Sequence, residues 1–248
     1  MAFPVTVSEI LLVLGLTADS SSDIATTDLI DTINHDADEI REICEDNTYD
    51  LTALTTHQTR LLSLCNWFVP AAEIILRRGA SKDPKGFIVF HQALIDTADY
   101  LKAHLRAGTF DQSWFKSTAI PDVSLVTAIK ASRPVPSFTP SASTTPNDTF
   151  VLMIADYWSA FVYSVAAGTS DLYLVPSSTA GLTTAQLDTY QKPVVSFTAS
   201  LVSRMRASAF LAPQLGIPVQ HKLGKVLYDR GLTEIAAITN GDKYNSFN

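Results

Sequence analysis

The amino-acid sequence predicts a mainly α-helical protein: a helical bundle with long helices, a Ser/Thr/Pro-rich arm and a second mainly helical region. Apolar residues recur at spacings of three and four over several long stretches, which is the period of an α-helix buried on one face. Hydrophobic residues make up 46% of the 248 residues, enough to bury a core. Capping and stop residues separate these stretches, so we expect several distinct helices.

Two helices are predicted in the first fifty residues. The first is short, spans residues 7–14, and begins after a polar cap at Thr6 or Ser8. The second carries the clearest helical periodicity in the sequence and ends near Tyr49. Its predicted buried face comprises Leu29, Ile30, Ile33, Ala37, Ile40, Ile43 and Cys44.

Two longer apolar helices are predicted next. The first spans about residues 56–78, and Pro70 within it is expected to kink or divide it, because proline lacks a backbone N–H and its ring clashes with the preceding turn. The second begins at Pro84, after a cap at Asp83, and ends before Gly108.

The middle of the chain changes in composition. Residues 109–132 are weakly patterned, with one short helix expected near residues 123–130. Eleven of the seventeen residues from 133 to 149 are Pro, Ser or Thr, four of them proline. We therefore predict an exposed, extended arm here that contacts a neighbouring subunit. The corresponding division of the chain is a helical domain at 1–108, a linker or extended arm at 109–148 and a second helical region at 149–248.

The second helical region opens with an apolar helix that is capped at Asn147 and Asp148 and extends to Gly168. Residues 150–167 approach the length of a membrane span, but the central Asp156 would cost about 3 kcal/mol in a bilayer. We therefore expect a buried core helix and no membrane partner. Asp156 is expected to pair with a Lys or Arg at the edge of the helix.

The remaining elements are less regular. A short strand is predicted at residues 172–175. A helical region opens at Thr183 and is expected to be interrupted at Pro193. A helix at about residues 220–228 and a short helix or strand near Ile235 complete the prediction.

The net charge of −7 is unevenly distributed. Residues 1–50 carry twelve acids against Arg41, whereas the rest of the chain carries 13 acids and 17 bases. We interpret the acids opposite the apolar face of the second helix as a candidate interface or channel face. They would meet a basic surface of another subunit or partner, line a channel through which DNA passes, or simply be solvated. These acids are Asp28, Asp31, Asp38, Glu39, Glu42, Glu45 and Asp46.

No catalytic motif is found in the sequence. It contains no GxSxG, HExxH or GxGxxG motif, and its five histidines include no pair at the i, i+4 spacing. We therefore predict no catalytic residues, no cofactor-binding or metal-binding residues, and a protein that is not an enzyme. Cys44 and Cys65 are expected to be small buried hydrophobic side chains.

The order of elements in the first hundred residues follows a pattern. The sequence VTVSEI at residues 5–10 leads into a short helix that ends in LGL at residues 14–16. DLI at residues 28–30 opens the acidic helix, and an apolar helix follows at residues 61–76. This order resembles the head–tail connector (adaptor) proteins of tailed bacteriophages over roughly residues 1–108.

The resemblance implies a structural virion protein. Subunits of this family form a ring below the portal that continues the DNA channel and presents a surface to the next tail component. It implies that the partners are copies of the chain itself together with portal and tail proteins, and that DNA passes without specific binding. It also implies a location in the virion after synthesis in the host cytoplasm, with no catalytic residues.

Two other classes remain open. A capsid- or filament-type protein that coats nucleic acid would need a basic groove with aromatic neighbours, and the sequence shows Arg204 and Arg206 but no dense basic cluster. A helical enzyme of unrecognised type is the second alternative. The negative net charge argues weakly against a dedicated nucleic-acid binder.

Overall fold

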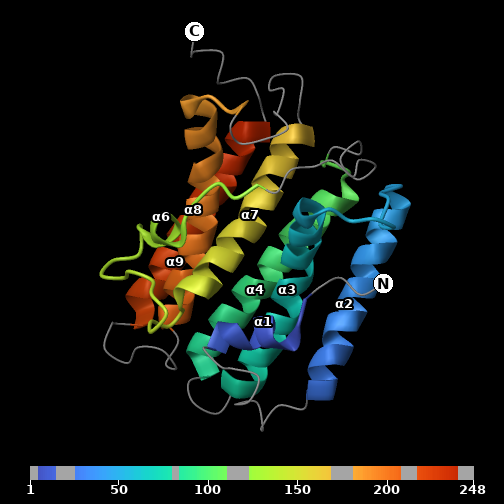
Figure 1. Cartoon of the computed structure of the whole chain (residues 1–248). Coiled ribbons are helices and arrows are strands. Elements are labelled where there is room, and N and C mark those ends of the chain that lie inside the picture. The colour runs from blue at the N-terminus through green and yellow to red at the C-terminus, as the bar shows by residue number, and fades with distance from the viewer. Residues whose placement is uncertain are drawn as a thin grey trace.

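The structure is a computed structural model that describes residues 5–14, 26–79, 84–110, 123–168, 181–207 and 217–239. Every regular element within these ranges is a helix, which confirms the mainly α-helical fold. Short elements are α1 (Val7–Leu11), a following 3-10 turn (Leu12–Leu14) and α6 (Ala128–Ser132). The long helices run alongside one another (Figure 1): α2 (Thr26–Asp46), α3 (Thr56–Gly79), α4 (Pro84–Arg106), α7 (Asp148–Gly168), α8 (Thr184–Ala207) and α9 (Ile217–Thr239).

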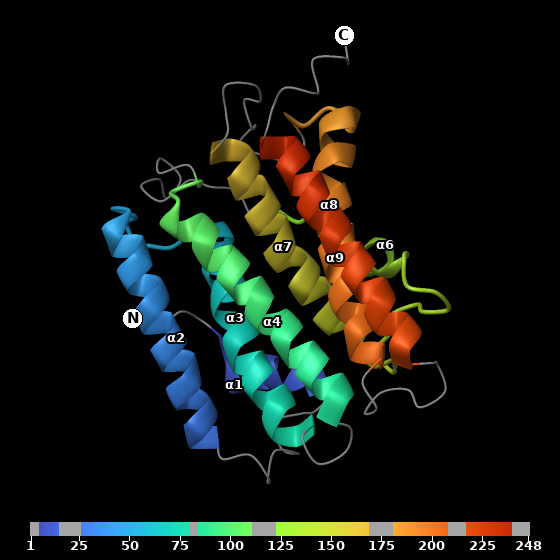
Figure 2. The same cartoon turned by 180° about the vertical axis from the view of Figure 1, so that it is seen from behind.

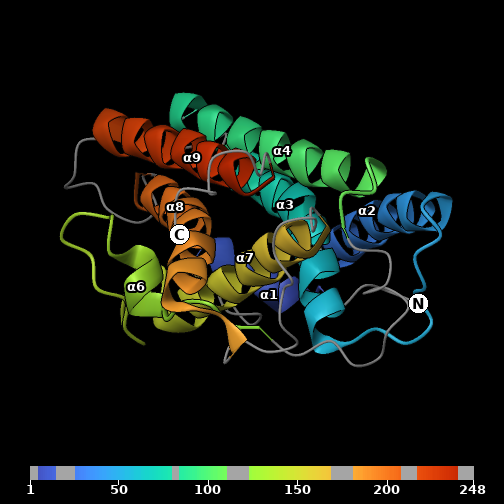
Figure 3. The ribbon, with the colours of Figure 1, turned by 90° about the horizontal axis from the view of Figure 1, so that it is seen from above.

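The helices α3 and α7 pack against each other in the middle of the bundle. Helix α2 packs on the outer side of α3, and α8 packs on the far side of α7. Helix α4 covers α3, and α9 covers α8 (Figure 2). As a result, α2 and α6 lie at opposite edges of the molecule, as the view along the bundle also shows (Figure 3).

One hydrophobic cluster joins side chains from residues 1–108 and from residues 149–248. Aromatic rings make the connection between helices. The ring centroids of Phe68 on α3 and Trp158 on α7 are 6.0 Å apart. Trp158 in turn stacks on Phe197 of α8, with ring centroids 4.2 Å apart. The two halves of the chain therefore share a core.

Helix α1 begins with a capping box. The backbone N–H of Glu9 donates to the Thr6 hydroxyl (3.3 Å), and the Thr6 N–H donates to the Glu9 carboxylate (2.7 Å). Thr6 is thus the cap, one of the two candidates that the sequence offered. The Trp67 ring N–H donates to the Glu9 carbonyl (3.3 Å), and the Tyr157 hydroxyl to its carboxylate (3.1 Å). These bonds fix α1 against α3 and α7.

Two internal prolines do not divide their helices. Helix α3 continues through Pro70 and α8 continues through Pro193, so the predicted division and interruption are wrong. Both prolines are buried, and the packing of each long helix offsets a cost of about 3 kcal/mol for proline in a helix interior. A bend at Pro70 stays a prediction. The C-terminal elements predicted separately form the single helix α9.

The Ser/Thr/Pro-rich segment folds back onto the bundle, so the prediction of an exposed, extended arm is wrong. Val135 and Phe138 are buried at 3% and 9% exposed, and the guanidinium of Arg206 lies 4.6 Å from the centre of the Phe138 ring. A turn closes between Ser141 and Thr144. Apolar residues spaced between the prolines anchor the segment. The strand predicted at residues 172–175 lies outside the described residues.

Two long apolar helices are largely buried within the bundle. By length and composition alone, residues 56–77 and 148–167 could each cross a membrane, but 72% and 83% of an apolar 18-residue window in each are buried in the fold. The carboxylate of Asp156 pairs with Arg60 of α3 (3.1 Å) and accepts a hydrogen bond from Ser124 (2.6 Å). This confirms the predicted pairing of Asp156 with a basic side chain.

Candidate interaction surface

The edge helix α2 has one face against the bundle and one face outward. Its buried hydrophobic residues are Leu29, Ile33, Ala37, Ile40, Ile43 and Cys44, all of which the sequence predicted. Ile30 is 43% exposed, so its assignment to the buried face is wrong. It lies on the border between the two faces, in the second turn of the helix, where neighbouring helices do not cover it.

The outward face holds the predicted carboxylates. Part of this face is paired within the chain: Asp28 lies 2.8 Å from Arg77 of α3, and Asp38 lies 2.5 Å from Arg41 one turn along α2. Arg77 also contacts Glu73 (2.7 Å) and so bridges two acids. The other carboxylates on this face extend along the helix without an ion pair to any described residue: Asp31, Glu42, Glu45 and Asp46.

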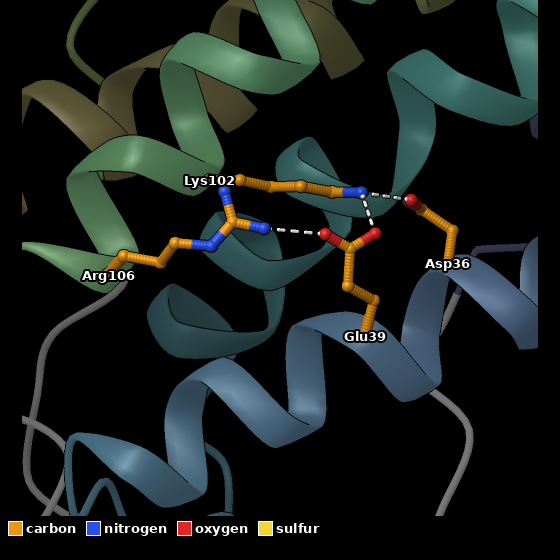
Figure 4. A network of polar contacts seen from close by, with 4 residues as sticks. All are labelled: Asp36, Glu39, Lys102 and Arg106. Atoms are coloured by element: carbon orange, nitrogen blue, oxygen red, sulfur yellow. Dashed lines mark hydrogen bonds and ion pairs between the residues drawn. The ribbon is translucent and has the colours of Figure 1, made fainter.

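Glu39 belongs to a network between α2 and α4 (Figure 4). The Lys102 ammonium donates to the Asp36 carboxylate (2.5 Å) and to Glu39 (2.7 Å). Arg106, one turn further along α4, donates to the other oxygen of Glu39 (2.7 Å). Two cations of α4 thus neutralise two acids of α2, and they do so at the edge of the acidic face.

The network shifts the pKa values of its members. Burial raises the pKa of Asp36 against the lowering effect of Lys102. Burial also acts on Glu39 and Lys102, but hydrogen bonds outweigh it: Lys102 and Arg106 lower the pKa of Glu39, and the two acids raise the pKa of Lys102. Glu39 and Lys102 therefore form a charged pair at neutral pH.

Sequence reasoning missed Asp36, which is 3% exposed. The signal was present, because Asp36 shares the helical spacing of Leu29, Ile33 and Ile40 and so lies within the buried stripe of α2. With its amide oriented to satisfy its neighbours, Asn66 of α3 donates to Asp36 (2.9 Å) and to the Ile33 carbonyl (3.2 Å). A charged residue inside an apolar stripe predicts a buried partner on the facing helix.

The C-terminal ends of α2 and α4 are tied together. The Asn47 side-chain amide donates to the carbonyl of Ile43 in α2 (2.9 Å) and to that of Leu105 in α4 (3.1 Å). Gly108 follows α4 in the left-handed conformation, with φ of 61°. This end of α2 has no basic residue in its last turn, so Glu42, Glu45 and the helix dipole oppose each other there.

The described residues contain no group of three or more His, Cys, Asp or Glu side chains placed to hold a metal ion. His57 contacts the Ser164 hydroxyl (2.8 Å) deep in the core, and burial, aided by Arg60, lowers its pKa to about 3. Cys44 is a free, buried thiol, as predicted, and burial raises its pKa to about 12. Cys65 is likewise free and buried.

The fold and this surface define the protein as an all-helical bundle, within its described residues, that presents an acidic helix at one edge. Comparisons with protein-family models, with curated proteins and with solved structures each found no match.

Proposed function

We propose that the chain is a structural subunit of a larger assembly, and specifically a head–tail connector (adaptor) subunit of a tailed bacteriophage. In this proposal copies of the chain form a ring below the portal, continue the DNA channel and bind portal and tail proteins. The protein is made in the host cytoplasm and becomes part of the virion. The resemblance of residues 1–108 to this family supports the specific assignment.

The observation that carries the proposal is the row of carboxylates on α2 that have no ion pair with the described residues: Asp31, Glu42, Glu45 and Asp46. Like charges at i, i+4 on a helix oppose folding by a few tenths of a kcal/mol per pair. An isolated subunit gains nothing in stability from this arrangement. Within an assembly, the face contacts a basic surface, or it lines a channel in which like charge keeps DNA from binding.

The first experiment is electron microscopy and native mass measurement of the full-length chain. We expect rings or tubes built from a 26.9-kDa subunit. A chain that stays monomeric at every concentration and salt tested would refute the proposal. Nucleic acid that remains bound through purification would instead favour the class of proteins that coat nucleic acid.

A charge reversal separates the roles of the acidic face. The variant replaces Asp31, Asp38 and Glu42 with Lys. Failed assembly, together with wild-type assembly that weakens as salt rises, supports a subunit contact. Normal assembly with newly acquired DNA binding supports the channel. If assembly, DNA binding and partner binding are all unchanged, the face is only solvated and the functional interpretation of α2 is wrong.

A further inference from the structure

A basic cleft lies at the edge of the molecule opposite α2. It has a volume of about 400 Å³ and lies between α6, the segment that follows α6, and the helices α8 and α9. Its basic lining residues are Lys130, Arg133, Lys192 and Arg230, and its acidic lining residue is Asp188. The four cations come from three separate parts of the sequence, around residues 130–133, 192 and 230, which is why no dense basic cluster is visible in the sequence itself.

The cleft is held in shape by its own hydrogen bonds. The Lys130 ammonium donates to the Gln191 side chain, whose amide donates to the Leu125 carbonyl (2.6 Å). On the α9 wall, Arg230 pairs with Glu234 one turn along the same helix (2.8 Å), and Glu234 accepts a hydrogen bond from the Ser196 hydroxyl of α8 (2.7 Å). These contacts join α6 to α8 and α8 to α9.

Two of the cations are not neutralised by the described residues. Arg133 and Lys192 are exposed, and neither forms an ion pair with the described part of the chain. Unneutralised cations on a preformed concave surface attract a negatively charged partner. The cleft is therefore opposite in charge to the exposed carboxylates of α2. Helix α6, which forms one wall of the cleft, lies at the other edge of the molecule from α2 (Figures 1 and 3).

We propose that this cleft receives the acidic face of α2 from a second copy of the chain. The proposal rests on the proposed function and adds to it the surface that the acidic helix contacts. Because the donor and acceptor surfaces lie at opposite edges, each copy binds one neighbour through α2 and another through its cleft. Such a head-to-tail contact generates a ring when the rotation closes and a filament when it does not.

The chemistry of the cleft favours a protein partner over a nucleic acid. Proteins that bind single-stranded nucleic acid combine cations with aromatic rings on which bases stack. The described residues that line this cleft include no aromatic side chain; besides the charged residues they are Pro134, Gln191, Val195 and Ser196. A row of carboxylates needs only the cations and the polar side chains.

The contact is expected to depend on salt. Helix α2 has 21 residues and is about 32 Å long, and at a width of about 10 Å it offers about 300 Å² of face. A stable interface takes about 800 Å² from each partner, so charge must supply much of the attraction through α2. Screening lengths fall from about 10 Å at 0.1 M salt to about 3 Å at 1 M, so assembly should weaken over that range.

The test uses two charge-reversed forms of the full-length chain. The edge variant carries Glu42→Lys and Glu45→Lys, which remove acids from the C-terminal end of a helix and so suit its dipole. The cleft variant carries Arg133→Glu and Lys192→Glu. A control variant carries Lys222→Glu and Lys225→Glu on α9, the same charge change at exposed positions outside the cleft.

Native mass spectrometry and sedimentation at low salt should show loss of the assembled species for each variant alone. An equimolar mixture should restore assembly, because the basic edge of one variant then meets the acidic cleft of the other. The control should assemble as the wild type does. Helicity measured by circular dichroism confirms that each variant is folded.

Three results would overturn this inference while leaving the proposed function in place. They are a cleft variant that assembles normally, two folded monomeric variants whose mixture stays monomeric, and a cleft variant whose only change is the loss of copurifying nucleic acid. A wild-type chain that never assembles would instead overturn the proposed function.

Discussion

The ammonium group of Lys102 lies 2.5 Å from the carboxylate of Asp36, and both side chains are almost fully buried, at 6% and 3% exposed. This pair joins α4 to α2 beneath the acidic face. A buried ion pair adds little net stability relative to well-packed apolar residues, but removal of one partner leaves an uncompensated charge in the core. The pair therefore makes the position of α2 depend on Lys102.

Replacement of Lys102 by Met should destabilise the protein by about 3–5 kcal/mol, because Asp36 would lose its cation inside the core. Unfolding in urea, monitored by circular dichroism, measures this loss of stability. Lys225→Met is the matched control, since Lys225 forms an exposed pair with Asp229 and should cost less than about 1 kcal/mol. Replacement of both Lys102 and Asp36 by apolar residues should recover much of the loss. Equal effects of the two Met variants would contradict the prediction.

The pH dependence of stability should reflect Glu39. The pKa of Glu39 in the folded state is lowered from 4.5. Its contribution to the free energy of unfolding is therefore present above pH 4.5 and is lost as the pH falls through the pKa of the folded state. Glu39→Gln should therefore give a shallower fall in the free energy of unfolding below about pH 4.5. The raised pKa of Asp36 acts with the opposite sign, so Asp36→Asn should make the fall steeper. Identical slopes for wild type and Glu39→Gln would show that the pair contributes nothing.

The raised pKa of Lys102 predicts that the protein also loses stability at alkaline pH. The contribution of Lys102 to the free energy of unfolding is present below the unfolded pKa of 10.5 and is lost as the pH rises through the higher pKa of the folded state. Denaturation titrated from pH 9 upward should begin at lower pH in Glu39→Gln, because one of the two carboxylates that hold the proton on Lys102 is then absent. An unchanged alkaline limit would count against the shared network.

The segment at residues 133–147 should resist proteolysis while Phe138 is anchored. Phe138→Ala removes the ring that contacts Arg206 and should open the segment to proteinase K, with fragments near 15 and 12 kDa as the products of one cut about the middle of the 26.9-kDa chain. Thr139→Ala, at an exposed neighbouring position, is the control and should be cut no faster than the wild type. Rapid cleavage of the wild-type chain within this segment would restore the expectation of an exposed arm.

The sequence predicted the helices well because their signals are local. The apolar face of α2 and the cap at Thr6 follow from spacing and from side-chain chemistry within one turn. The predicted interruptions at Pro70 and Pro193 were wrong for a related reason. The cost of proline in a helix interior can be read from the local sequence, whereas the packing that offsets it comes from neighbouring helices.

The candidate surfaces were only partly predictable. Periodicity alone identified the acidic face of α2, since it concerns one helix. The basic cleft combines residues from three helices and a loop, for example Arg133 and Arg230, and no pattern in the sequence brings them together. The pairing of Asp36 with Lys102 likewise depends on how two helices pack, although Asp36 stands out as a charge in the apolar stripe of α2.

Helices α8 and α9 approach each other closely at Phe197 and Gly231. A Cβ atom placed on Gly231 would lie 2.7 Å from a ring carbon of Phe197, closer than real side chains approach. Phe197 cannot move aside easily, because its ring stacks on Trp158 with centroids 4.2 Å apart. Alanine normally stabilises a helix by about 1 kcal/mol relative to glycine, but overpacking of a core costs about 1–3 kcal/mol.

Gly231→Ala should therefore destabilise the protein in urea unfolding, against the propensity of alanine. A second variant, Phe197→Leu, places a smaller side chain at the point of contact and by itself also lowers the free energy of unfolding. In the double variant, Gly231→Ala should cost less than it does in the wild type, so that a double-mutant cycle shows coupling between the two positions. If Gly231→Ala is neutral or stabilising, or if the two effects simply add, then the helices do not pack as closely here as the structure shows.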